Sequence, residues 1–285
     1  PEKKVAWRSQ LNDIADEAIA ELALIDPDLE FQKAYYMDHS SLRLALESLI
    51  KAGCETILYQ SINSALYTDF EDYGRTLPLL HKLANHRALI VMADQLGNQA
   101  VYREAYFQML RDRLLEIESE KSVLVILSCH GHPFKKETQD QRAPLYRKPL
   151  EEGIRSILSE RSGSWELIWS FDEYADHYWD KRDQRIETFE AYRKAIDEGF
   201  DYVIELPTEF AAENTDLMIF HAIKKFKAFR SYNFLDPVPY PDWGKPLVRR
   251  FQEGKTIGIY NGTPVGAYRK YIVQAVVNSI STLLE

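Results

Sequence analysis

Apolar positions along the first part of the chain follow two alternating spacings. Residues 10–24 place Leu11, Ile14 and Leu22 at helical spacing, with acidic residues on the other face, and this pattern predicts an amphipathic helix. Short apolar runs of strand length then alternate with further segments of helical periodicity, which predicts successive β-α units. We expect strands at 31–37, 55–60 and 88–93, and helices at 40–53, 69–84 and 99–118.

The second half of the chain repeats this alternation. Residues 122–130 (SVLVILSCH) are almost continuously apolar, which is typical of a strand covered on both faces in a parallel sheet. The four prolines of 236–246 exclude regular structure there. Further strands are expected at 165–171, 201–207 and 255–260, and further helices at 148–160, 183–198, 213–228 and 266–284. The pattern predicts an α/β protein of two similar Rossmann-like domains, each a parallel four-stranded sheet flanked by helices.

Composition narrows the class of protein. A chain of 285 residues, 45% hydrophobic and 28% charged, is long enough to bury the core of one large or two medium domains. The formal net charge of −9 argues against nucleic acid as a partner. Cys54 and Cys129 are isolated beside apolar runs, so we expect no disulfide framework, no iron–sulfur cluster and a cytoplasmic location. No apolar run reaches the roughly 18 residues of a membrane span, which leaves peripheral membrane contact open.

Candidate chemistry is expected at the strand ends, because ligands bind beyond the carboxyl ends of strands in open parallel sheets. His130 ends the most apolar strand, with Gly131 beside it and His132 two residues later. A lone histidine at a strand end is more often bonded to a backbone carbonyl, but two histidines in three residues favour ligation or proton transfer. His130 is therefore the first candidate.

The loop after 201–207 carries three acids, Glu209, Glu213 and Asp216. Acids at a helix start are favoured by the helix dipole, so capping alone would explain one or two of them. If they converge with His130 at one sheet edge, they form a proton-handling or metal-binding set. Gly262 and Thr263 follow a strand, but the turn lacks the further glycines and the lysine of a nucleotide site.

These segments together resemble the ferrochelatase family over most of the chain. VLVILSCHGHP resembles the family motif SAHS-P or SAHG-P, which places the family's metal- and proton-handling histidine on His130. YVIELPTEFAAENTDLM resembles VxPxxFVxDHxETL, which places the catalytic glutamate on Asp216. The segments 31–68 and 166–180 resemble the family's first-domain stretch and its WQS…PWLGP region.

The order of the segments suggests a circular permutation. The family's opening strand and GTP turn are absent from the start, whereas TIGIYNGTPVGAYRKYI at 256–272 matches them, and 240–251 resembles the usual C-terminal helix. Such a permutation is tolerated where chain ends are close and exposed. A chance GTP after an extra strand, or a fragment of a longer chain, is the alternative. The resemblance implies a first domain of 1–118 plus 253–285, opened by the tail strand, and a second domain of 119–252 with His130 and Asp216.

The resemblance implies a class II tetrapyrrole chelatase that inserts ferrous iron into protoporphyrin IX or coproporphyrin III in heme biosynthesis. Fe2+ would be a substrate, and no cofactor would stay bound. The implied catalytic residues are His130 and Asp216, with Glu213 as a further metal ligand. The implied substrate-binding residues are Tyr260, Asn261, Gly262, Thr263, Phe210, Trp179 and Ser61.

The chain departs from the family pattern at several of these positions. Asp216 is one methylene shorter than the family glutamate, Ser61 and Asn261 replace a histidine and a tyrosine of some members, and Phe220 and Lys224 replace an acidic track. Two alternatives follow. One is a cobalt or nickel chelatase for sirohydrochlorin with His132 and Glu209 as extra ligands, and the other is a non-catalytic tetrapyrrole- or metal-binding relative.

Overall fold

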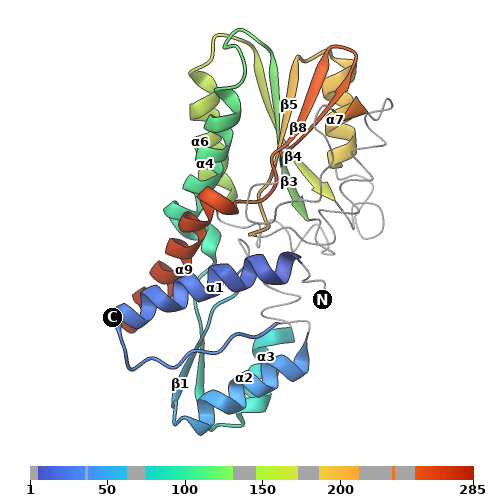
Figure 1. Cartoon of the computed structure of the whole chain (residues 1–285). Helices are drawn as coiled ribbons and strands as arrows, with labels where there is room; N and C mark the ends of the chain where they lie inside the picture. The colour runs from blue at the N-terminus through green and yellow to red at the C-terminus, as the bar shows by residue number, and fades with distance from the viewer. Residues whose placement is uncertain are drawn as a thin grey trace. The chain divides into compact units, whose positions relative to one another are not determined.

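The computed structural model describes residues 6–35, 38–62, 75–130, 146–172, 186–211, 233–234 and 248–285. It consists of two compact units, which are described separately (Figure 1). The larger unit contains residues 1–10 and 103–269, and the smaller unit contains residues 11–102 and 270–285.

A six-stranded sheet forms the centre of the larger unit. Its order is β4-β3-β5-β8-β7-β6; the first four strands are parallel, and β7 and β6 continue the sheet antiparallel. The residues of β3 from Val123 to Leu127 are fully buried, because this strand has neighbours on both sides and helices on both faces. The strands are β3 (Val123–His130), β4 (Trp165–Asp172), β5 (Tyr202–Pro207), β6 (Asn233–Phe234), β7 (Arg249–Glu253) and β8 (Thr256–Tyr260).

Helices cover both faces of this sheet. Helix α7 (Thr188–Asp197) packs on one face, where Tyr192 joins a buried apolar cluster with residues of β3, β5, β7 and β8. Helices α4 (Ala100–Leu114) and α6 (Arg147–Ser159) lie on the other side of the sheet (Figure 1). Gly153 of α6 faces the ring of Phe107 on α4 so closely that a Cβ there would overlap the ring. The larger unit is thus a three-layer α/β/α arrangement.

Strands β7 and β8 form a tight hairpin. Glu253 and Thr256 are paired across it, and Gly254 in the turn has a φ of 59°, a conformation that glycine adopts without strain. The hairpin holds β8 against β7 on one side and β5 on the other.

This hairpin corrects two expectations. The resemblance placed a helix at 240–251, but Arg249–Glu253 is a strand whose central Phe251 is buried in the core. The tail strand was expected to open the sheet of the first domain, but it lies in the larger sheet because the two-residue turn ties it to β7. The permuted chain order was inferred from the order of the sequence motifs, and it stays a prediction.

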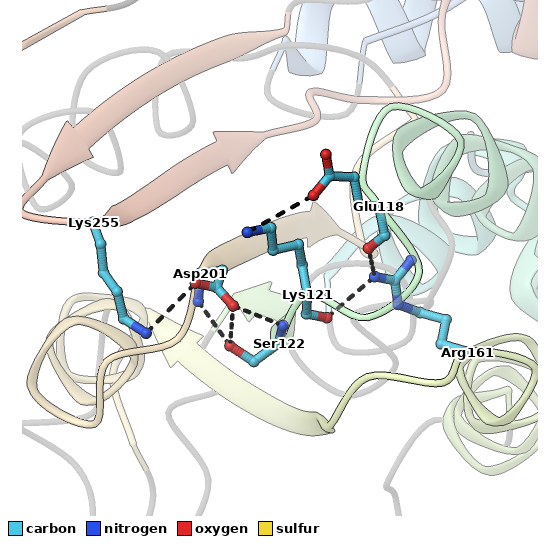
Figure 2. A network of polar contacts seen from close by, with 6 residues as sticks. All are labelled: Glu118, Lys121, Ser122, Arg161, Asp201 and Lys255. Carbon is cyan, nitrogen blue, oxygen red and sulfur yellow. Dashed lines mark hydrogen bonds and ion pairs between the residues drawn. The ribbon is translucent and has the colours of Figure 1, made fainter.

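The amino ends of β3 and β5 are joined by contacts between side chains and backbone (Figure 2). One Asp201 carboxylate oxygen accepts from the backbone N–H of Ser122 at 3.0 Å and from its hydroxyl at 2.9 Å. These bonds, assisted by Lys255 at 3.5 Å, hold the pKa of Asp201 below its ordinary value. Arg161 donates to the carbonyl oxygens of Glu118 at 2.8 Å and Lys121 at 3.2 Å.

The smaller unit contains a two-stranded parallel sheet with helices packed around it. Its core is formed by Leu42, Leu46, Ile57, Leu80 and Ile90. Its elements are α1 (Ala6–Ile25), of which residues 11–25 belong to this unit, α2 (His39–Lys51), β1 (Thr56–Tyr59), α3 (Leu77–Ala84), β2 (Leu89–Met92) and, apart from its first residue, α9 (Arg269–Leu284).

One predicted strand of this unit differs from the structure. Residues 31–35 of the predicted strand 31–37 are not paired in a sheet, and most of them are exposed. Tyr35 is instead fixed by side chains, since its hydroxyl donates to Asn12 at 2.8 Å and its N–H donates to Ser41 at 3.3 Å.

The predicted α/β class is confirmed, with helices that flank mainly parallel sheets. The strands are distributed differently, since the described residues hold two strands in the smaller unit and six in the larger, where four and four were expected. The predicted helix at 213–228 and the proline-rich loop at 236–246 lie outside the described residues.

Candidate functional site

The carboxyl ends of the parallel strands bring the candidate residues to one edge of the larger sheet. His130 is the last residue of β3, and its backbone is paired in register with Asp172, the last residue of β4. Beyond the end of β5, Thr208 N–H still donates to the carbonyl of Ser128 at 3.0 Å. His130 therefore lies between the ends of two neighbouring strands, and Asp172 is an acid at this edge that the sequence reading did not single out.

A buried ion pair lies at this edge. Arg147, the first residue of α6, donates from Nη2 to Glu209 Oε1 at 2.5 Å, and the Tyr146 hydroxyl donates to the same oxygen at 3.1 Å. The Glu209 side chain is 1% exposed and that of Arg147 is 17% exposed. Burial alone would lower the pKa of Arg147, but the Glu209 carboxylate outweighs it and raises the pKa. The Glu209 carboxylate thus favours the charged form of Arg147.

Arg147 spans the end of β3. Its guanidinium carbon lies 5.6 Å from the ring centre of Trp169 and 5.1 Å from that of Phe171, and both rings belong to β4. Its ionic partner Glu209 follows β5, and β3 lies between these two strands. The guanidinium therefore reaches across the strand that ends at His130.

Cys129 lies beneath this ion pair and is fully buried. Burial, together with the Glu209 charge, raises the pKa of its thiol, although Arg147 opposes the shift. Its sulfur is 3.5 Å from the Thr208 hydroxyl. The thiol at this position is a neutral packing group next to His130.

A second buried acid, Glu205, lies within β5, two residues before the carboxyl end of this strand. Glu205 of β5 is fully buried and accepts from the Ser128 hydroxyl at 2.9 Å and from the Tyr192 hydroxyl at 2.8 Å. The three side chains link β5, β3 and α7. The sequence reading missed Glu205, although a carboxylate inside the apolar run of residues 202–207 was its signal.

The turn after β8 is packed into the larger unit. Asn261 is buried, and its side-chain amide donates to the carbonyl of Met109 at 3.1 Å. Gly262 has a φ of 56°, and the next residue, Thr263, is fully buried. Tyr260 belongs to the apolar cluster beneath α7. These side chains are buried inside the larger unit, and their roles in substrate binding stay predictions.

Two further predicted substrate residues, Phe210 and Ser61, are also mostly buried. Phe210 is 8% exposed, and its carbonyl accepts from the Tyr106 hydroxyl at 3.4 Å. Ser61 follows β1 in the smaller unit and is 8% exposed. For both, binding of a ligand stays a prediction.

Several candidates fall outside the described part of the chain. These are His132, Trp179, Glu213 and Asp216, together with Phe220 and Lys224 of the replaced acidic track, and the side chain of His130. Within the described ranges, no three residues among His, Cys, Asp and Glu form a group able to hold a metal ion. Over the same ranges, no helix combines the length and apolar character that a membrane span requires. The predicted metal ligands thus stay predictions.

Comparison with solved structures identifies the fold. SirB from Bacillus subtilis with Fe3+ is similar to this chain, with a TM-score of 0.61 and 12% sequence identity over 99% of this chain and 90% of that chain. The chain has the fold of SirB. The sirohydrochlorin chelatase SirB from Bacillus subtilis subspecies spizizenii in complex with cobalt is similar over the same shares, with a TM-score of 0.50 and 12% identity. No protein-family model and no curated protein sequence matches the chain.

The SirB likeness confirms the predicted chelatase-like fold. At 12% identity it concerns the fold alone. Both similar structures are SirB proteins, so the closer resemblance to ferrochelatases stays a prediction.

Proposed function

We propose that this protein inserts a divalent metal ion into a tetrapyrrole. The observation that carries the proposal is the similarity to SirB over 99% of the chain, because one of the SirB structures was determined with Fe3+ and the other with cobalt. The position of His130 supports it, since ligands of open parallel sheets bind at the carboxyl edge where β3 ends.

The reaction requires groups that handle protons and metal. A divalent ion replaces the two pyrrole N–H protons of the macrocycle, so two protons leave for each ion that enters. In the proposal His130 contacts the metal or the pyrrole nitrogens, and Asp216 accepts protons. Asp172 is an acid whose backbone is paired in register with His130. A cleft that holds the macrocycle bent would favour the transition state.

Two substrates are proposed. The motifs around His130 and Asp216 favour ferrous iron and a porphyrin, which is ferrochelatase chemistry. The SirB likeness favours sirohydrochlorin with iron or cobalt. Glu209 is no longer proposed as a ligand for the second substrate, because its carboxylate is buried against Arg147 and Tyr146. His132 remains a proposed ligand.

A metal-insertion assay tests the proposal. Purified protein is mixed with Fe2+, Co2+ or Ni2+ and with protoporphyrin IX, coproporphyrin III or sirohydrochlorin, and the loss of the free-base absorbance bands is followed. We expect turnover with one tetrapyrrole class and a rate at least about 100-fold lower in His130→Ala. The matched control is His81→Ala, which removes an exposed histidine of α3 and should keep the wild-type rate.

Each other result has a distinct meaning. Equal rates for wild type and His130→Ala would remove the role given to His130. Tight tetrapyrrole binding without turnover under any metal would replace the enzyme with a binding protein. Absence of both binding and turnover would refute the proposed function.

A further inference from the structure

The guanidinium of Arg147 has more hydrogen-bond donors than its described partner uses. A guanidinium carries five N–H donors, and the ion pair with Glu209 is made by Nη2. Nε is buried and has no hydrogen-bond partner among the described residues. The side chain as a whole is 17% exposed. An arginine in this state can accept a second anion.

The surroundings of Arg147 hold it in one orientation. Its guanidinium contacts the rings of Trp169 and Phe171, and the Trp169 indole is itself fixed by a 2.8 Å hydrogen bond to Glu151. Glu209 is fixed in turn by the Tyr146 hydroxyl. A donor group that is already ordered loses little entropy when a ligand binds.

Arg147 lies near the position where metal insertion is proposed. The guanidinium crosses the end of β3, where Cys129 directly precedes His130. In a tetrapyrrole the metal lies at the centre of the ring, whereas the carboxylates hang from its rim. A cation that binds a carboxylate should therefore lie near the metal-binding residue, and Arg147 lies at the sheet edge where the strand of His130 ends.

We propose that Arg147 binds a carboxylate of the tetrapyrrole substrate. This inference rests on the proposed function and names a contact that selects the substrate. A planar guanidinium matches a carboxylate through two parallel hydrogen bonds, which an ammonium group does not reproduce. Glu209 is then a positioning residue that holds Arg147 charged and oriented in its buried place.

The experiment compares a free acid with its ester. Binding of coproporphyrin III and of its tetramethyl ester is titrated in the same mild detergent, by fluorescence quenching, for wild type, Arg147→Lys and Arg111→Lys. Lysine keeps the positive charge beside Glu209. Arg111 is a half-exposed arginine of α4 in the same unit that pairs with Glu104, so its variant is the matched control. Far-ultraviolet circular dichroism checks that each variant is folded.

We expect wild type to bind the free acid at least about tenfold more tightly than the ester, and Arg147→Lys to lose this preference. Arg111→Lys should keep it. Equal affinity of the wild type for the free acid and the ester would overturn the inference without any variant. An Arg147→Lys variant that loses the same amount of affinity for both ligands would also overturn it. If wild type binds neither these porphyrins nor sirohydrochlorin, the proposed function fails and the inference fails with it.

Discussion

The two ends of the larger sheet use arginine and acid side chains in different ways. At the amino ends, Arg161 donates to backbone carbonyls, and Asp201 accepts from the backbone N–H and the hydroxyl of Ser122 (Figure 2). At the carboxyl ends, Arg147 and Glu209 are buried against each other, and the Nε–H donor of the guanidinium has no hydrogen-bond partner among the described residues.

This difference separates a structural from a functional use of charge. A side chain that satisfies backbone groups completes the fold, and its removal leaves a gap in the local hydrogen bonding. A buried ion pair is costly to desolvate and is a weak source of stability, so its presence at a strand edge calls for another reason. We therefore expect changes at the amino ends to alter stability alone.

The largest effect is expected from Glu209→Ala. This change leaves the Arg147 charge buried without its carboxylate, so we expect the free energy of unfolding to fall by about 3–5 kcal/mol in urea titrations. Glu209→Gln keeps an oxygen for Arg147 and Tyr146 and should lose less. A Glu209→Ala protein as stable as wild type would mean that Arg147 has another anionic partner and that the comparison of the two ends is wrong.

A smaller loss is expected from Gly163→Ala at the amino ends. An added Cβ would lie 2.5 Å from the carbonyl oxygen of Lys121 and 2.6 Å from that of Glu120, and these backbone atoms must move. We expect a loss of about 1–3 kcal/mol by thermal denaturation, with unchanged metal insertion once the protein is folded. The comparison variant is Gly254→Ala, where nothing lies within 4 Å and backbone strain at positive φ acts alone. Unchanged stability in Gly163→Ala would contradict the close approach.

The smallest effect is expected from Asp201→Asn and depends on pH. Because hydrogen bonds from Ser122 lower the pKa of Asp201 in the folded state, its carboxylate stabilises the protein above the unfolded-state pKa of about 4 and loses this contribution as the pH falls through the lower folded-state value. The variant should be about 1 kcal/mol less stable at pH 7, and the difference should shrink below about pH 4. A difference that stays constant down to pH 3 would show that the carboxylate charge contributes nothing.

The spacing of apolar residues predicted most helices and strands, because each element has its own local pattern of apolar and polar positions. The apolar run of residues 122–130 became the most buried strand, and the helix at 148–160 was found within one residue of α6. Residues 31–35 failed as a strand because Tyr35 bonds instead to side chains of two helices, to Asn12 through its hydroxyl and to Ser41 through its N–H, which no local pattern reveals. The β7–β8 hairpin was missed because the alternation in Arg249–Glu253 is too short to distinguish a strand from a helix end.

The site was harder to predict than the fold. The strand-end rule brought His130 and Glu209 to one edge of the larger sheet, but pairing partners depend on tertiary packing. Arg147 is separated from Glu209 by 62 positions in the chain, and nothing in its own sequence neighbourhood distinguishes it from other arginines. Glu205 differs from Arg147, because an acid inside an apolar run is visible in the sequence alone.

The division of the chain into units also bears on how it is made. The smaller unit is built from residues 11–102 and 270–285, and the Ser279 hydroxyl of α9 donates to the Asp94 carbonyl at 3.2 Å. A ribosome therefore releases the first part of this unit long before the helix that completes it, with the whole larger unit translated in between. Until α9 has been synthesised, residues 11–102 expose part of the apolar surface that this helix later covers. During this period the nascent chain most needs a chaperone.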